Sequence, residues 1–181
     1  CALAVFRHND LAHLEEILHK SRYLDYSRIF IVTESIFSMD GDSSDVKQLV
    51  EMARNYGAIL VVDEAHATGV AGARGMGLTA GTAVDCCMGT FGKALGSFGA
   101  YGTFSKEMRD YLINCCSGFI YSTALPPSVM GAVDAALDLV PEMDRERKQL
   151  MEKARELRAE LHRMGWDTGL SATHIIPIIL G

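Results

Sequence analysis

Short apolar runs alternate along this chain with longer segments in which apolar residues recur every three or four positions. The short runs favour β-strands and the amphipathic segments favour α-helices. The expected strands are Ile29–Val32, Ile59–Val62, Val84–Met88, Ala100–Phe104 and Phe119–Tyr121. The expected helices are Asp10–His19, Ser44–Asn55, Lys106–Cys116 and Pro126–Val140. Strands that alternate with helices are typical of βα units and of a mostly parallel sheet.

The pattern changes after Pro141. Residues 144–164 read as a charged helix with one apolar face. The positions on that face are Leu150, Ala154, Leu157, Leu161 and Met164. Residues 175–180 are expected to form a further strand. We therefore predict an α/β fold with a mostly parallel central sheet flanked by helices in residues 1–140, and a connector helix and the start of another domain in residues 141–181.

Composition and charge narrow the function classes. With 181 residues, 49% of them apolar and 22% charged, the chain is suited to a soluble globular core. A net charge of -6 argues against nucleic acid as a partner, because phosphate backbones are bound by basic surfaces. No apolar run approaches the roughly 20 residues that span a bilayer, so we expect no membrane partner and a cytoplasmic location. The start at Cys1, without a methionine, suggests a fragment of a longer protein.

The five cysteines lack the spacing of a zinc site, and we expect them to be reduced and mostly buried. The chain also contains carboxylates and histidines, which are side chains of metal-binding type. Three carboxylates near one turn are Glu34, Asp40 and Asp42. Aspartates beside a glycine more commonly form turns than bind metals. His8, His13 and His19 lack the spacing of four that pairs two ligands on one helix face, so we interpret them as surface residues and expect no metal.

Chemically active side chains follow two neighbouring expected strands. Ligands bind at the carboxyl ends of parallel strands, and Asp63 directly follows one strand while Lys93 follows the next. Lys93 lies in the glycine-rich segment 89–102, whose composition suits a loop around a small molecule. Pyridoxal phosphate (PLP) requires an amine for a Schiff base, a carboxylate that keeps its ring nitrogen protonated, and donors for its phosphate. These residues therefore predict a PLP site.

Each candidate also has a structural interpretation. A single lysine in a glycine-rich loop is usually solvated, and His66 can equally bond a loop carbonyl. The hydroxyls of Ser38 and Thr90 can cap turns. Tyr121-Ser122-Thr123, before a double proline, has no local rationale, which raises the interest of that segment as a ligand contact.

Two motifs suggest other functions. Residues 63–66 spell Asp-Glu-Ala-His, a box that nucleotide hydrolases also carry at a strand end. That class needs a G-x-x-x-x-G-K-[ST] phosphate loop, but Lys93 is followed by Ala94, and Cys87 occupies the position of the first glycine. Residues 75–80 match G-x-G-x-x-A by letters, but a loop precedes them rather than the strand that a dinucleotide fingerprint requires.

Four motifs in order resemble the α-oxoamine synthases, PLP-dependent enzymes of the aspartate aminotransferase fold. These motifs are residues 33–42 (TESIFSMDGD), 62–69 (VDEAHATG), 89–96 (GTFGKALG) and 120–127 (IYSTALPP). They span nearly the whole chain. Within the family, residues 91–101 and 175–181 are most similar to the enzymes of biotin synthesis that condense L-alanine with a pimeloyl thioester. The resemblance implies that residues 1–140 belong to a PLP-binding large domain, and that residues 141–181 form a connector helix and the start of a smaller C-terminal α/β domain.

The resemblance also implies a role for each matching position. Lys93 would carry PLP as a Schiff base, and Asp63 would pair with the ring nitrogen. His66 and Ser38 would lie near the phenolic oxygen of the ring. Thr90 would bind the phosphate, and Thr123 would reach the phosphate of the neighbouring subunit in a homodimer with shared active sites. Further family residues would precede Cys1 and follow Gly181, so the fragment alone is expected to be inactive.

Several activities fit this resemblance. The implied substrates are an amino acid, L-alanine, and an acyl thioester carried by coenzyme A or an acyl carrier protein. Glycine C-acetyltransferase and 5-aminolevulinate synthase are alternative activities on the same site. A non-catalytic subunit of the same fold is a different class, and the presence of Lys93 with Asp63 and His66 argues against it.

Overall fold

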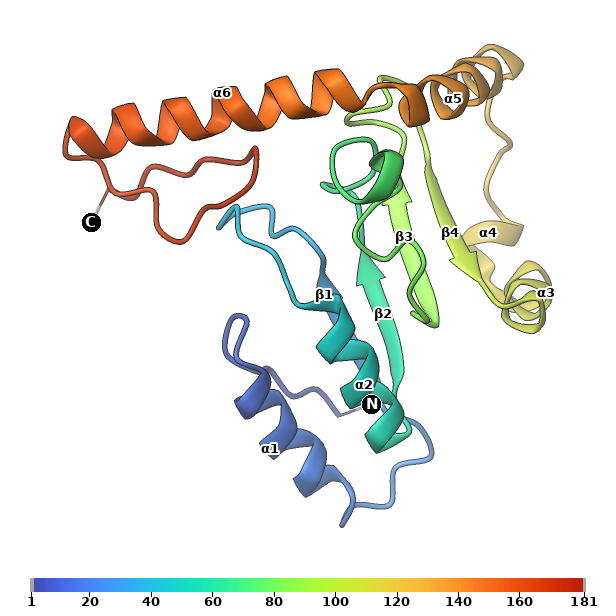
Figure 1. Ribbon diagram of the computed structural model, residues 1–181. Helices are drawn as coiled ribbons and strands as arrows, with labels where there is room; N and C mark the ends of the chain where they lie inside the picture. The colour runs from blue at the N-terminus through green and yellow to red at the C-terminus, as the bar shows by residue number, and fades with distance from the viewer. Residues whose placement is uncertain (1, 181) are drawn as a thin grey trace.

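The computed structural model describes residues 2–180, in which a sheet of four strands forms the centre of the molecule. The strands are β1 (Phe30–Glu34), β2 (Ile59–Asp63), β3 (Cys86–Thr90) and β4 (Ala100–Phe104). They lie in the order β1-β2-β3-β4 (Figure 1). The first three strands are parallel and β4 is antiparallel to β3. The carboxyl ends of β1, β2 and β3 therefore meet at one edge, where Glu34 is the register partner of Asp63.

One face of this sheet is covered by α1 (Leu11–Ser21) and α2 (Val46–Tyr56). The apolar core between them consists of Leu14, Leu18, Ile31, Val46, Leu49, Val50, Ala53, Leu60 and Val62. The side chain of Asp45 caps α2 by accepting a hydrogen bond from the backbone N–H of Gln48, and Gly57 ends the helix in a left-handed conformation.

The opposite face of the sheet is open. Phe30, Val32 and Met88 point to this side and are 55%, 65% and 44% exposed. Along β1, the exposed apolar side chains of Phe30 and Val32 flank the buried side chain of Ile31, because successive residues of a strand face opposite sides of the sheet. Both faces are apolar, which is typical of a strand that is buried on both sides.

The second half of the chain is largely helical. It contains α3 (Lys106–Cys115), α4 (Ser117–Ile120), α5 (Pro127–Leu139) and α6 (Asp144–Arg163), with a short 3-10 turn at Val140–Glu142; another 3-10 turn, Ala73–Gly75, lies between β2 and β3. In Figure 1, α6 crosses above the carboxyl ends of the parallel strands, and the C-terminal segment returns beneath it. The expected domain division falls at the turn between α5 and α6, and it stays a prediction.

Two strand predictions were wrong. Phe119 and Ile120 belong to the short helix α4 and Tyr121 caps its C-terminal end; the N–H groups of Phe119 and Ile120 donate to the carbonyl of Cys116. A three-residue apolar run has no periodicity that separates helix from strand. Residues 175–180 make an isolated bridge, Asp167 to Ile179, because no strand among residues 2–180 pairs with the rest of the segment.

The prediction of mostly buried cysteines was only partly right. Cys87 is buried, Cys86 and Cys116 are half-buried, and Cys115 is exposed; Cys1 lies outside the described residues. Burial raises the pKa of the Cys86 and Cys87 thiols. Among residues 2–180, no helix combines the length and the apolar character needed to span a bilayer.

Candidate active site

The carboxyl edge of the sheet places two acidic side chains opposite each other, Glu34 at the end of β1 and Asp63 at the end of β2. The backbone N–H of Ala65 donates to Oδ1 of Asp63 at 2.7 Å. The other carboxylate oxygen has no hydrogen-bond partner among residues 2–180. Glu34, Asp63 and Met88 line a cavity of about 480 Å³ on the open face, a volume in the range of small-molecule sites.

His66 lies in the turn after β2, within the field of three charged residues. Its half-buried ring has a lowered pKa, because burial disfavours the cation and the positive charge of Lys93 adds to that effect. The carboxylates of Glu34 and Asp63 oppose the shift. The structure thus brings His66, Asp63 and Lys93 into one electrostatic cluster, with His66 as a neutral imidazole near pH 7.

Lys93 is exposed on the loop that joins β3 to β4. Backbone hydrogen bonds hold this loop closed: Phe91 N–H donates to the carbonyl of Gly99 at 2.9 Å, and Ser97 N–H donates to the carbonyl of Phe91 at 2.8 Å. The carbonyl of Lys93 accepts from Gly96 N–H at 3.0 Å. The loop backbone is fixed while the Lys93 side chain makes no ion pair or hydrogen bond with any described residue, so its amine is available to a ligand.

Thr90, the predicted phosphate contact, already uses its hydroxyl within this loop. Its Oγ1 donates to the carbonyl of Gly99 at 3.0 Å and accepts from Gly92 N–H at 3.1 Å. The turn-capping interpretation is therefore correct for this residue. A phosphate role would require the hydroxyl to release Gly99, and it stays a prediction.

Ser38 and Thr123 lie on loops at different places in the fold. Ser38 is exposed on the loop after β1, and its backbone N–H donates to Oε2 of Glu34 at 3.0 Å, which anchors the loop to the strand end. Thr123 is exposed in the connection between α4 and α5, beyond β4, whereas β1 lies at the other edge of the sheet (Figure 1). The cofactor contact of Ser38 and the phosphate contact of Thr123 stay predictions.

Glu64, the second letter of the Asp-Glu-Ala-His box, has a structural role. Its carboxylate is only 1% exposed and accepts hydrogen bonds from the backbone N–H groups of Leu78 and Thr79 at 2.9 and 3.0 Å. A side chain at Gly77 would collide with this carboxylate. Burial nevertheless raises the pKa of Glu64. The residues that match G-x-G-x-x-A thus wrap a buried glutamate, which removes both the hydrolase and the dinucleotide interpretations.

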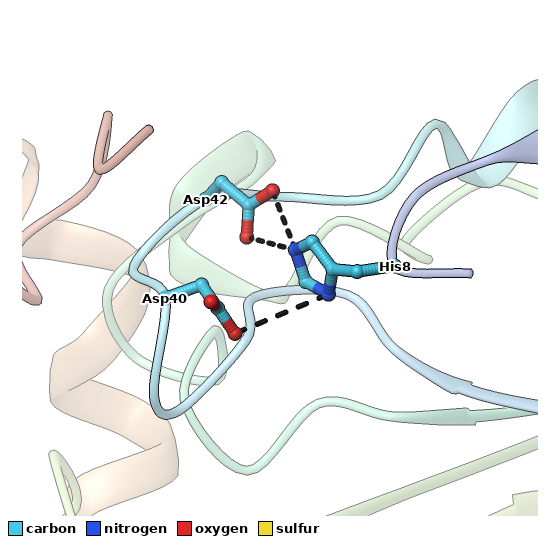
Figure 2. Close-up of side chains that lie close together, drawn as sticks. All are labelled: His8, Asp40 and Asp42. Carbon is cyan, nitrogen blue, oxygen red and sulfur yellow. Dashed lines mark hydrogen bonds and ion pairs between the residues drawn. The ribbon is translucent and has the colours of Figure 1, made fainter. Parts of the chain in front are cut away.

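The acidic turn pairs with His8 rather than with Glu34. Figure 2 shows His8 between Asp40 and Asp42. Nε2 of His8 lies 2.9 Å from Oδ2 of Asp42, and Nδ2 of Asn9 donates to the same oxygen at 2.6 Å. Asp40 is farther away, with 3.9 Å between its Oδ2 and Nδ1 of His8. The side chains satisfy one another, as expected for a turn; the interpretation of His8 as a plain surface residue was incomplete.

Tyr101 and His174 also lie near the cluster, but no sequence pattern points to them. The hydroxyls of Tyr101 and Thr68 lie 2.6 Å apart beneath the lysine loop, where the Tyr101 ring contacts Phe91 at a centroid distance of 5.3 Å. His174, in the C-terminal segment, lies close enough to His66 for that ring to contribute to its lowered pKa. Neither residue directly follows an expected strand, so a search of the positions after each strand does not identify them.

The cluster fits the ring end of PLP. A free primary amine at Lys93, an unengaged carboxylate oxygen at Asp63 and a neutral imidazole at His66 are the three groups that a protonated pyridine with an aldehyde and a phenolic oxygen requires. Phosphate donors are less evident among the described residues, because the hydroxyl of Thr90 is engaged.

Comparisons with known proteins agree with this interpretation. The model of the family described as aminotransferase class I and II matches residues 2–181. The 8-amino-7-oxononanoate synthase of Gluconacetobacter diazotrophicus is 55% identical over 177 residues, covering 97% of this chain and 44% of that protein. A relative from Desulfosudis oleivorans is 56% identical over 181 residues, covering 100% of this chain and 47% of that protein. The chain spans about half the length of these curated relatives.

Solved structures show the same fold. A serine palmitoyltransferase from S. paucimobilis, with a bound PLP-myriocin aldimine, has a TM-score of 0.88 and 28% identity, and the match covers 97% of this chain and 47% of that one. An 8-amino-7-oxononanoate synthase from Francisella tularensis has a TM-score of 0.75 and 25% identity, covering 92% and 48%. The predicted fold class, that of a PLP-dependent transferase, is confirmed.

Proposed function

Because this chain belongs to the aminotransferase class I and II family, we propose that it forms much of the PLP-binding domain of an α-oxoamine synthase. The proposed reaction is the decarboxylative condensation of L-alanine with a pimeloyl thioester, which gives 8-amino-7-oxononanoate for biotin synthesis. The cluster of Asp63, His66 and Lys93 at one sheet edge carries the proposal. The choice of substrates rests on the names of the relatives.

Lys93 would act as both anchor and proton carrier. When bound, PLP withdraws electrons from the substrate carbon attached to it. The Nζ of Lys93 would hold the cofactor until the amino acid displaces it, then take the α-proton and later return a proton to the product. A flexible primary amine on a loop with a fixed backbone suits both tasks, since the side chain can move while its base stays in place.

Asp63 and His66 would set the charge of the ring. The unengaged oxygen of Asp63 would accept a hydrogen bond from a ring N–H and so favour its protonated form. A neutral His66 can exchange a hydrogen bond with a phenolic oxygen, and Ser38 would add a second contact from the loop after β1. Thr90 would bind the phosphate, and Thr123 the phosphate of a neighbouring subunit in a homodimer.

The alternatives share this chemistry. Glycine C-acetyltransferase and 5-aminolevulinate synthase differ in the amino acid and the acyl group, and the acyl carrier would be coenzyme A or a carrier protein. A non-catalytic subunit would not need Lys93 beside Asp63 and His66. A cytoplasmic location, and the absence of nucleic-acid and membrane partners, belong to the same proposal.

The test is visible absorbance of the protein that carries this chain, reconstituted with PLP. We expect the band of lysine-bound cofactor in the wild type and in Lys106→Ala, an exposed control on α3. Lys93→Ala should lack the band and lose activity by about 10³-fold, the scale of a lost acid–base group. Titration with alanine and with glycine then separates the alternatives. Turnover at the wild-type rate in Lys93→Ala would exclude the proposed mechanism.

A further inference from the structure

The C-terminal segment is fastened to the loop after β1 by one carbonyl. The oxygen of Gly41 accepts three hydrogen bonds: from the N–H groups of Ala172 and Thr173, each at 3.0 Å, and from Oγ1 of Thr173 at 2.8 Å. Gly41 has φ +69, and a Cβ there would collide with the carbonyl of Ile175, so only glycine fits. Figure 1 shows the two segments side by side. We call this contact the Gly41 clasp.

Helix α6 supports the clasp from the other side. The guanidinium of Arg158 donates to the carbonyl of Thr173, and Oγ of Ser171 donates to the carbonyl of Ile175 at 2.5 Å. Thr173 is only 8% exposed. An irregular segment with this many hydrogen bonds has a defined backbone, so the residue that follows Thr173 is held in place.

That residue is His174, and the clasp holds it at the edge of the active-site cluster. It is half-buried, and its Nδ1 is buried with no hydrogen-bond partner among residues 2–180. The loop that the clasp holds also donates the backbone N–H of Ser38 to Oε2 of Glu34 at the carboxyl edge of the sheet, and His174 lies close enough to His66 for that ring to contribute to its pKa. Burial, with a contribution from His66, lowers the pKa of His174, so its ring is neutral near pH 7.

A buried polar atom without a partner costs about 1–3 kcal/mol, so such an atom in a site is expected to meet a polar group of a ligand. A neutral imidazole can donate one hydrogen bond without adding a second cation beside Lys93. Its natural partner is a carbonyl or carboxylate oxygen. Both substrates of the proposed reaction carry such an oxygen, the amino acid in its carboxylate and the acyl thioester in its carbonyl.

We propose that His174 is a substrate-binding residue, positioned by the Gly41 clasp, whose Nδ1 donates a hydrogen bond to a carbonyl or carboxylate oxygen of the bound substrate. The inference rests on the proposed function. It adds to the site a residue from the C-terminal segment, more than 100 residues from Asp63 along the chain.

The test uses the PLP-reconstituted protein that carries this chain. His174→Ala removes the donor, whereas the amide nitrogen of His174→Asn lies near the place of Nδ1. His19→Ala, on the exposed side of α1, is the matched control. Two constants are measured: the Kd of the amino acid alone, from its absorbance change, and the KM of the acyl thioester. Thermal midpoints and the cofactor band are recorded for every variant.

We expect His174→Ala to raise one of the two constants about 10-fold, the effect of a lost hydrogen bond of about 1.4 kcal/mol. The constant that rises identifies the substrate. His174→Asn should recover most of the loss, and the cofactor band should be unchanged. Constants within twofold of the wild type would overturn the inference, as would an asparagine variant as weak as the alanine variant. A wild type without the cofactor band would instead contradict the proposed function itself.

A second variant tests the role of the clasp. Thr173→Val removes the hydroxyl that donates to Gly41 but leaves both backbone donors, and Thr173→Ser keeps the hydroxyl as its control. Thr173→Val should raise the same constant as His174→Ala. In the double variant the two effects should not add, because the clasp acts through His174. Fully additive effects would show that the clasp does not position this residue and would overturn that part of the inference.

Discussion

Two adjacent carboxylates at the end of β2 have opposite surroundings. Glu64 turns into the protein, where the backbone N–H groups of Leu78 and Thr79 surround it. Asp63 points to the open cavity and keeps one oxygen free of any described partner. The carboxylate of Glu64 is fully used in holding the loop at Leu78 and Thr79. Asp63, which we assign to a ligand, keeps an oxygen that can still accept a hydrogen bond. Unused hydrogen-bonding capacity at a strand end, rather than acidity, therefore separates the residue that we propose to bind a ligand from the structural one.

The largest effect is expected from emptying the Glu64 pocket. Glu64→Ala leaves the half-buried N–H groups of Leu78 and Thr79 without an acceptor and opens a cavity, so the free energy of unfolding should fall by about 2–4 kcal/mol. Urea unfolding of the variant and the wild type measures the difference. Glu156→Ala, exposed on α6, is the control and should change the free energy of unfolding by less than about 0.5 kcal/mol. A loss below about 1 kcal/mol at Glu64 would show that water replaces the carboxylate.

A smaller effect is expected in the pH dependence of stability. Burial raises the pKa of Glu64 in the folded protein above its unfolded value. The folded state then binds the proton more tightly, so the contribution to stability is complete below the unfolded pKa and is lost as the pH rises through the folded pKa. Relative to Glu64→Gln, which does not titrate, the wild type should lose stability as the pH is raised from 4 to 8.

Unfolding curves of both proteins across that range check the sign. A wild type that gains stability over Glu64→Gln with rising pH would mean that the hydrogen bonds to the carboxylate outweigh its burial. The pKa of Glu64 in the folded protein would then lie below its unfolded value, and burial would no longer distinguish the surroundings of Glu64 from those of Asp63.

The smallest effect on stability is expected at Asp63. In Asp63→Asn the amide oxygen can still accept from Ala65 N–H, so the free energy of unfolding should change by less than about 0.5 kcal/mol. The same variant should impair catalysis with the cofactor still bound, because a neutral amide no longer favours a protonated ring. Denaturation and steady-state assays on one preparation measure both quantities. A large loss of stability with unchanged activity would assign Asp63 to the fold.

Much of the fold followed from apolar periodicity. The strands Ile59–Asp63 and Ala100–Phe104 and the long helices lie where the pattern predicts them, because their apolar faces are the ones that pack. The error at Phe119–Tyr121 has a physical reason. Backbone hydrogen bonds to Cys116 and Ser117 extend the preceding helical region, and a run of three apolar residues cannot reveal them.

The sequence predicts the candidate site residues only where they directly follow a strand. Asp63 and Lys93 stand out because parallel strands bring their carboxyl ends to one edge. The Gly41 clasp joins residues 132 positions apart, and the His8–Asp42 pair joins residues 34 apart. Contacts of that kind depend on how loops return to the sheet, and no local pattern encodes them.

The antiparallel strand β4 has a consequence for the order in which the molecule forms. The pair Thr90 and Ala100 closes the Lys93 loop with a separation of 10 residues, whereas Phe30 and Ile59, which join β1 to β2, are 29 residues apart. Closing the shorter loop costs about 1 kcal/mol less chain entropy. The β3–β4 hairpin is thus the most local pairing of the sheet and is favoured to fold early. The lysine loop would then take its shape before the two parallel crossovers are complete.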